Sequence, residues 1–430
     1  MSVHCVTTLP SAAGKVKRFQ LFFSYVIALL QFNRRCFIAV IRNVRVLDVI
    51  GLSFMSALES IIRTFRRTSA DPTAYAKAWK AKTHRPVIGY LCTYTPVELI
   101  QAAGALPLRL FESTGDMTAA DLHFQSYSCS LARGCLEGAL QGEFDFLDGM
   151  VFCHTCDTMQ RLSDIWRMNI AVGFHTDLLL PSKLHTESAV EYMLAETNTL
   201  QATLQDRLRT VITETDLRGA VGTYNRIRQT LRRLYEMRRR RPEILKSVDL
   251  HALLKCAMIM DPVAYLEKIT RLPALLDKEK METAPGRKRV VLCGGACSQP
   301  DLYTIVEDAG AVVVYDDLCT GGRFLTGEIA LEGDLAASIV RRYAARPVCP
   351  AKHAGLFSRA AELLQSVTHA NADGVIIFFL KFCDPHAFDY PYLKAALEEK
   401  GVPVLAVELE TAAASRGQLR TRCEAFVEML

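Results

Sequence analysis

The chain has 430 residues, half of them hydrophobic, which is enough for two or three domains with buried cores. Its formal net charge is +5, and residues 1–54 hold seven Lys or Arg against a single acid. The rest of the chain is nearly neutral, so it lacks the basic surface typical of nucleic-acid-binding proteins, and no nucleic acid is expected as a partner.

Residues 1–54 differ in character from the rest of the chain. Their longest apolar run, 19–32, is shorter than the about 20 residues that a membrane-spanning helix needs, and no signal-peptide cleavage site follows it. An amphipathic segment that lies on a membrane surface is an alternative interpretation of these residues. We interpret 1–54 as a doubtful N-terminal extension, read in frame upstream of a start at Met55, and expect a cytoplasmic protein with no transmembrane segment.

Residues 55–185 begin with a helical pattern and then alternate between strand and helix patterns. Runs of β-branched, aromatic and other apolar residues predict three buried strands, at 85–92, 106–111 and 146–153. Helices are predicted between them, the first with Thr95 as its N-cap. This alternation indicates a parallel sheet covered by helices on both faces, the first α/β domain.

Residues 186–285 carry long, charged helical patterns without strand runs and are interpreted as a helical insertion or connector. Strand patterns return in 286–430, the predicted second α/β domain, at 289–295, 311–317, 374–383 and 402–408. The expected fold is therefore α/β, with two Rossmann-like or flavodoxin-like parallel-sheet domains and a cleft between them.

The chain contains 14 cysteines, and many of them fall where predicted strands end. These are Cys92, Cys153, Cys156, Cys293, Cys319 and Cys383, while Cys129 lies at a predicted helix start on the same side. Ligands of open α/β sheets bind at the carboxyl ends of strands, so several thiols are expected to converge in the cleft.

Four interpretations of these cysteines compete: a zinc site, a redox disulfide at the Cys153–Cys156 pair, an iron–sulfur cluster, and packing of apolar thiols. Compact zinc knuckles are absent from the sequence, and an isolated CxxC pair is a weak signal. The sequence also has no P-loop pattern, so any ATP hydrolysis would have to come from a partner.

Three segments decide among these interpretations: residues 89–110, 125–166 and 379–408. In this order they resemble the motifs of the 2-hydroxyacyl-CoA dehydratase and benzoyl-CoA reductase family, in particular the 2-hydroxyglutaryl-CoA dehydratase D-component. The resemblance extends from about Arg85 to Leu430. It implies two facing α/β domains with a 4Fe-4S cluster in the interdomain cleft, held by Cys92, Cys129 and Cys383.

The resemblance also implies an oxygen-sensitive enzyme with several partners. These are a related sister subunit or a second copy of the chain, a separate ATP-hydrolysing iron–sulfur activator, and an acyl-CoA substrate. The activator supplies one low-potential electron, a ketyl radical forms on an (R)-2-hydroxyacyl-CoA, and a 2-enoyl-CoA results. Two alternatives are a subunit of a benzoyl-CoA-type reductase and a non-catalytic cluster-binding partner subunit.

One departure from the family pattern concerns Cys156 and Cys319. Both match cysteines of a sister branch whose members resemble double-cubane proteins, in which six cysteines hold an 8Fe-9S cluster that reduces small molecules. This chain matches five of the six, and the remaining position falls near Gln141. A double-cubane reductase is therefore a further alternative, with Cys156 and Cys319 as additional metal ligands.

Other candidate residues lie next to the predicted ligands. Glu98 and His154 are candidate acid–base residues, although Glu98 would also complement a helix dipole and His154 would also suit a strand end as a polar residue. Ser128 and Ser130 flank Cys129, and their hydroxyls are candidates for hydrogen bonds to cluster sulfur.

Overall fold

The computed structural model describes residues 56–113, 115–279, 286–295, 301–409 and 416–430. Residues Ala57–Leu430 form one compact unit, separate from Met1–Ser56, and only this larger unit is described below. The predicted N-terminal extension therefore lies outside the described residues. The domain boundaries at 185 and 285 stay predictions.

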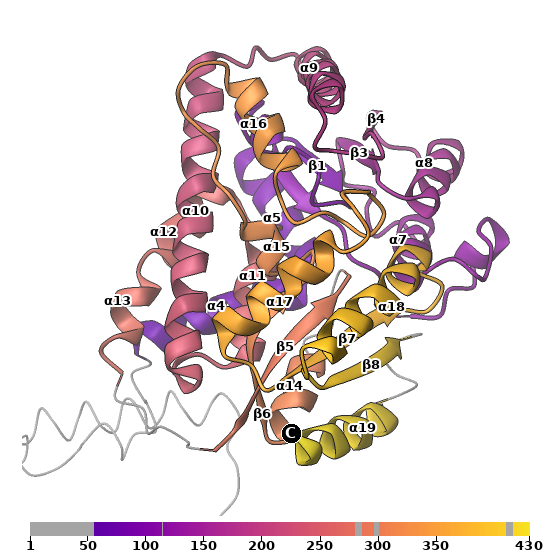
Figure 1. The fold of residues 1–430 in the computed structure, drawn as a ribbon. Helices are drawn as coiled ribbons and strands as arrows, with labels where there is room; N and C mark the ends of the chain where they lie inside the picture. Colours follow the sequence, from indigo (N-terminus) through magenta and orange to yellow (C-terminus); the bar gives the residue numbers. More distant parts are fainter. Residues whose placement is uncertain (1–55, 114, 280–285, 296–300, 410–415) are drawn as a thin grey trace, which may run out of the picture. The chain divides into compact units, whose positions relative to one another are not determined.

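The first sheet contains four parallel strands in the order β2-β1-β3-β4 (Figure 1). The strands are β1 Val87–Tyr90, β2 Leu106–Arg109, β3 Gly149–His154 and β4 His175–Leu179. Two helices precede them, α4 Ala57–Ala70 and α5 Pro72–Thr83, and the break between these helices falls where Asp71 caps α5 and Pro72 occupies its first turn.

Helices cover both faces of this sheet. They are α6 Val97–Ala102, α7 Ser130–Leu140 and α8 Asp157–Asn169. The predicted N-cap of α6 is wrong by one residue, because Pro96 occupies that position. The Thr95 hydroxyl instead lies 3.1 Å from the sulfur of Cys153.

Between β4 and β5 the described residues form helices and no strand, as the charged helical patterns predict. They are α9 Glu187–Leu208, α10 Glu214–Arg240, α11 Ser247–Cys256, α12 Pro262–Ile269 and α13 Leu272–Leu276. The long helix α10 begins with a capping box between Thr213 and Asp216. It contacts α6 and also α15 and β6, so it runs beside elements of both sheets (Figure 1).

The second sheet repeats the strand order of the first, as β6-β5-β7-β8, again all parallel. Its strands are β5 Lys288–Gly294, β6 Ala311–Asp317, β7 Gly374–Leu380 and β8 Val404–Leu409. Its helices are α14 Asp301–Asp308, α15 Gly322–Leu325, α16 Leu335–Ala344, α17 Ser358–Ala370, α18 Asp384–Glu399 and α19 Arg416–Met429. Two four-stranded parallel sheets with helices confirm the predicted α/β fold class.

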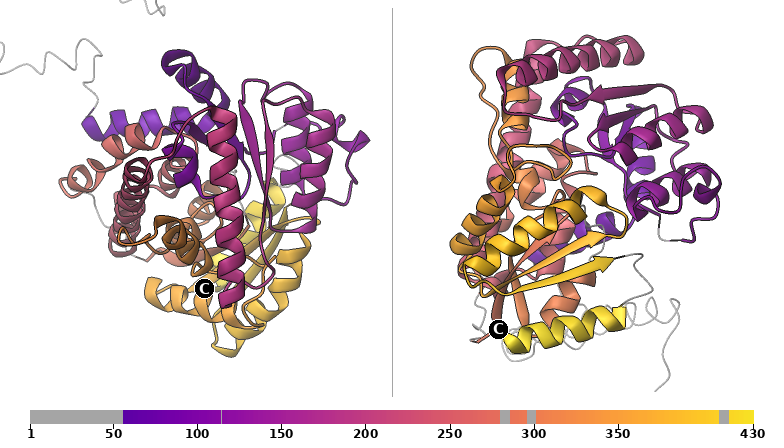
Figure 2. Two further views of the ribbon diagram at one scale, coloured as in Figure 1. Left: turned by 90° about the horizontal axis from the view of Figure 1, so that it is seen from above. Right: turned by 45° about the vertical axis from the view of Figure 1, so that its right-hand side comes forward.

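Opposite faces of the second sheet pack against different helices. Side chains of α14 and α19 complete one apolar core, and those of α17 and α18 complete the other (Figure 2). Helix α16 departs from this plan, because Leu335, Ile339 and Tyr343 pack into a core with Leu99 and Val151 from the first sheet region. The segment after β6 therefore completes the core of the first sheet.

Within the described part of the chain, no helix is both long and apolar enough to cross a membrane.

Candidate metal centre

The predicted ligands lie where strands end and helices begin. Cys92 follows β1 by two residues, and Cys319 follows β6 by two residues. Cys129, Cys156 and Cys383 are the N-cap residues of α7, α8 and α18. None of these three thiols makes a capping hydrogen bond to its own helix. A helix N-terminus carries partial positive charge, which favours a thiolate anion.

The backbone before Cys383 is strained. Phe382 has a φ of 63°, in the left-handed region that bulky residues rarely adopt. Such conformations cost on the order of 1–2 kcal/mol and persist where the surrounding structure enforces them, often at functional sites. This turn directs the chain from the end of β7 into α18 and presents Cys383 at the junction.

The thiols from the two sheets lie close enough to interact electrostatically. Burial raises the pKa of Cys383, and the neighbouring Cys129 and Cys156 raise it further. The pKa of Cys156 is raised to about 12 by burial and then by Cys129 and Cys92. Cys92 in turn has its pKa raised by burial and by Cys319. The five predicted cysteines thus form one connected group, although their assignment as ligands stays a prediction.

This group does not resemble a site for a single metal ion. Among the described residues, no three Cys, His, Asp or Glu side chains converge as ligands of one ion. Each thiolate ligand of a cubane binds a different iron, so cluster ligands surround the cluster and need not meet at one point. Thiols from separate strand ends and helix N-termini suit such a cluster.

Other cysteines expected near strand ends lie in apolar cores. Cys153 packs in the core behind β3, and Cys293 packs against α17 and α18 with its thiol directed to Asp317 at 3.5 Å. Cys135 is fully buried on α7. For these residues the packing interpretation fits better than the metal interpretation.

Glu98 is fully buried beside α10. Its Oε1 accepts a 2.8 Å hydrogen bond from Arg228, and the Tyr343 hydroxyl lies 3.0 Å from its Oε2. Burial alone would raise the pKa of Glu98, but Arg228 and Arg342 outweigh burial and lower it. The carboxylate is therefore ionised and held by structural partners, and its acid–base role stays a prediction.

His154 lies at the end of β3, and its imidazole contacts the neighbouring strand. Its Nε2 is 2.9 Å from Asp177 Oδ1 on β4, and Asp177 also contacts Ser163. The two serines beside Cys129, Ser128 and Ser130, are both buried. The predicted roles of His154 and of these two hydroxyls stay predictions.

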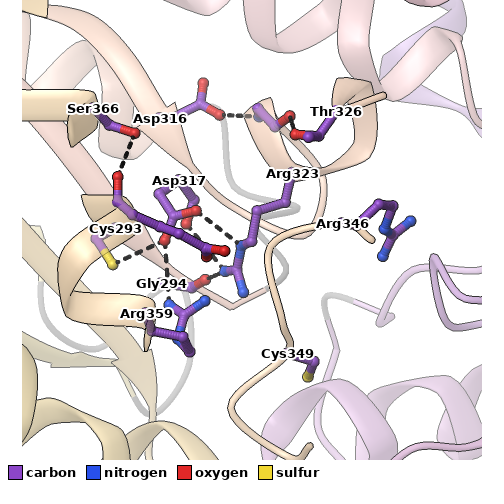
Figure 3. A network of polar contacts seen from close by, with 12 residues as sticks. Cys293, Gly294, Asp316, Asp317, Arg323, Thr326, Arg346, Cys349, Arg359 and Ser366 are labelled. Carbon is purple, nitrogen blue, oxygen red and sulfur yellow. Dashed lines mark hydrogen bonds and ion pairs between the residues drawn. The ribbon is translucent and has the colours of Figure 1, made fainter. Parts of the chain in front are cut away.

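A network of buried charges lies at the ends of β5 and β6 and was not predicted from the sequence (Figure 3). Asp317 lies 3.3 Å from Arg323 and 3.2 Å from Arg359, and Arg359 also pairs with Asp389 at 2.7 Å. The sequence feature that could have indicated this network is the Asp pair that ends β6, with Arg323 following after two glycines. Arg323 also places positive charge beside Cys319.

Comparisons with known proteins identify the family of the chain. A family model described as "2-hydroxyglutaryl-CoA dehydratase, D-component" matches residues 92–430. The chain is 26% identical to lactoyl-CoA dehydratase subunit beta of Anaerotignum propionicum over 383 residues, covering 87% of this chain and 100% of the relative. It is 28% identical to the (R)-phenyllactyl-CoA dehydratase beta subunit of Clostridium sporogenes over 382 residues, with the same coverage.

A third relative is named for a different reaction. This benzoyl-CoA reductase subunit, from Thauera aromatica, is 27% identical over 362 residues, which cover 83% of this chain and 94% of the relative. The family model covers far more than half of the chain, from Cys92 to its last residue. The chain therefore belongs to the 2-hydroxyglutaryl-CoA dehydratase D-component family.

Proposed function

We propose that the chain is the iron–sulfur subunit of an ATP-dependent radical dehydratase, which converts an (R)-2-hydroxyacyl-CoA to a 2-enoyl-CoA. One observation carries the proposal: buried thiols from both sheets, Cys92, Cys129 and Cys383 among them, lie near one another where a strand ends or a helix begins. The printed names of two relatives, both dehydratase beta subunits, supply the reaction class.

The protein side chains suit a 4Fe-4S cluster at this place. Thiolates of Cys92, Cys129 and Cys383 would hold it, and the N-termini of α7 and α18 would stabilise the second and third of them. When bound, the cluster would supply one-electron chemistry and an iron able to act as a Lewis acid. Buried arginines such as Arg323 offset the negative charge of the thiolates.

The partners in this proposal follow from the names of the relatives and from what the sequence lacks. A beta subunit requires a sister subunit, and the chain has no P-loop for ATP. We therefore include a sister subunit, a separate ATP-hydrolysing iron–sulfur activator and an acyl-CoA substrate. A subunit of a benzoyl-CoA-type reductase is the second candidate, supported by the third relative.

A third candidate is a double-cubane reductase of small molecules. It is supported by Cys156 and Cys319, which belong to the same set of neighbouring cysteines as the three predicted ligands. Iron stoichiometry separates this candidate from the single-cubane enzymes, because a double cubane holds about eight irons and a single cubane about four.

The test is iron and acid-labile sulfide in anaerobically purified protein, for the wild type and for Cys92→Ala, Cys129→Ala and Cys383→Ala. Cys423→Ala is the matched control, because this cysteine lies on α19 and is buried in a different core. We expect iron and sulfide in the wild type and the control, and a loss in each of the three variants. A wild type that binds no iron, or binds zinc instead, would contradict the proposal.

The reaction class needs a separate assay. The loaded chain, its sister subunit and the activator would be supplied with ATP and a 2-hydroxyacyl-CoA, and formation of the enoyl-CoA double bond would be followed by its absorbance. Turnover of an aromatic acyl-CoA to a diene, with no dehydration, would instead favour the reductase.

A further inference from the structure

We propose that the cavity between helix α10 and the edge strand β6 is a binding site for a small aromatic carboxylic acid, separate from the candidate metal centre. The cavity has a volume of about 360 Å³, within the range of about 300–1,000 Å³ that is typical of small-molecule sites. One face of α10, strand β6, helix α15 with the residues after it, and the end of α17 surround it. Among the described residues that line it there is no cysteine, so the inference does not rest on the iron–sulfur function proposed above.

Two tyrosine rings give the cavity its aromatic interior. The ring centroids of Tyr235 and Tyr315 are 5.6 Å apart, with an interplanar angle of 60°. The Tyr235 hydroxyl donates to Asp316 at 2.7 Å, and the Tyr315 hydroxyl is hydrogen-bonded to Ser366. Both hydroxyls are therefore engaged by side chains outside the lining, and the rings offer mainly carbon atoms to the cavity. A further ring packs well against such a pair, which favours an aromatic ligand.

The charged side chains around the cavity carry an excess of positive charge. Arg232 and Arg239 lie two turns apart on the face of α10 that lines the cavity, and both are partly exposed. Arg232 pairs with Glu328, whereas Glu236 is shared between Arg239 at 2.6 Å and Arg240 at 2.9 Å. Three arginines thus face two carboxylates, which leaves one positive charge for a monoanionic ligand.

Arg232 is the cation best placed for the carboxylate of that ligand. It donates to the Leu325 carbonyl at 2.7 Å, which fixes the guanidinium against the wall formed by α15, and it also contacts Glu328. A guanidinium has five N–H donors, so these two bonds leave others for a ligand. Arg239 is less available, because it is the first cause that lowers the pKa of Glu236 to about 2 and so keeps a charged partner at neutral pH.

The lining of the cavity is joined to the turn that carries Cys319. Asp316 accepts hydrogen bonds from the Tyr235 hydroxyl at 2.7 Å and from the Gly322 amide at 2.8 Å. Tyr235 and Gly322 both line the cavity, and Gly322 lies three residues after Cys319. A ligand that packs against both residues would restrict the segment from the end of β6 to α15.

The experiment titrates the full chain with phenylacetate and follows binding by ligand-observed nuclear magnetic resonance. Phenylacetamide and 2-phenylethylamine are the matched probes, because they carry nearly the same aromatic body with a neutral or a cationic group. We expect phenylacetate to bind about tenfold more tightly than the amide, because hydrogen bonds to an ionised acceptor are stronger than those to a neutral one. The amine should bind most weakly.

Two variants and one control locate the site. Arg232→Gln should weaken phenylacetate binding about tenfold, because it removes the cation that holds the carboxylate. Arg233→Gln is the matched control, since its side chain is 64% exposed on the same helix, lies 3.8 Å from Asp277 and does not line the cavity. Ala370→Phe fills the cavity from the end of α17 and should abolish binding. The melting temperature of each variant shows whether it is folded.

Hydrogen exchange of the wild type gives a result that needs no substitution. Phenylacetate should slow amide exchange in residues 316–327, where the ligand restricts the turn and α15, and leave α18 unchanged. Three results would each overturn the proposal: no binding at millimolar phenylacetate, equal affinity for all three compounds, or protection elsewhere in the chain but not in 316–327. Equal binding by Arg232→Gln and Arg233→Gln would do the same. The assay needs no iron, so these results leave the proposed function untouched, and a chain that binds no iron leaves this site untouched.

Discussion

Replacing Glu98 with Gln tests whether this buried carboxylate is structural. Both Glu98 and Arg228 are 0% exposed, and they are joined by a 2.8 Å contact. The amide keeps the size of the side chain but removes its charge, so Arg228 is left buried without a counter-charge. Breaking a buried pair in this way costs about 3–5 kcal/mol. With a urea slope of about 3 kcal/mol/M, the unfolding midpoint should fall by about 1 M or more.

The same pair predicts the direction in which the stability of the chain changes with pH. The pKa of Glu98 is lowered from its ordinary value of 4.5 in the folded chain. Its contribution is therefore complete above this ordinary value and is lost as the pH falls through the lowered folded value. The wild type should lose stability on this acid limb, and Glu98→Gln should lose less, because it no longer has the carboxylate that becomes protonated.

Two controls make the Glu98 test decisive. Glu214→Gln removes an exposed partner of Arg218 and should cost less than about 1 kcal/mol. The double variant Glu98→Leu with Arg228→Met replaces the pair by apolar side chains and should recover much of the lost stability. If Glu98→Gln unfolds within about 1 kcal/mol of the wild type while the loaded enzyme is inactive, the structural interpretation is refuted in favour of an acid–base role.

Three further substitutions test the fold by urea or thermal unfolding. Gly294→Ala should destabilise the chain by more than about 1 kcal/mol, because the added Cβ would overlap the Phe378 carbonyl oxygen of the adjacent strand. A variant as stable as the wild type would contradict this close approach of the two strands. Gly219→Ala, exposed on α10 with open space around it, should instead stabilise by about 0.5–1 kcal/mol, and a loss would contradict the helix assignment. Asp334→Ala should cost about 1 kcal/mol, because it removes the N-cap of α16, and an unchanged melting temperature would count against that cap.

The fold was largely predictable because most strands are buried on both faces. β5 carries the apolar run Val290 to Cys293, and β7 carries an unbroken run of Val, Ile, Phe and Leu, which leave a clear signal in the sequence. β4 was missed because His175, Thr176 and Asp177 in it are polar and half-buried. Local composition cannot identify such a strand, because only its pairing with β3 defines it.

The candidate site was predictable only in part, for a related reason. Cysteines that follow strands could be placed by the rule that ligands bind at strand ends. The charge network around Asp317 could not, because Arg359 reaches Asp317 from 42 residues further along the chain. The partner of Glu98 was hidden likewise, since Arg228 lies 130 residues further along the chain.

The contacts between helix α16 and the first sheet have a consequence for the stability of the chain without a cluster. Tyr343 bonds both Glu98 and the Thr95 carbonyl, and its helix completes an apolar core, so distant segments are joined without any metal. In small zinc-binding domains, by contrast, metal uptake and folding are a single event. If this chain holds the cluster proposed above, loss of that cluster to oxygen would leave a folded chain. Oxygen damage would then be repaired by inserting a new cluster into the same folded chain, without synthesis of a new protein.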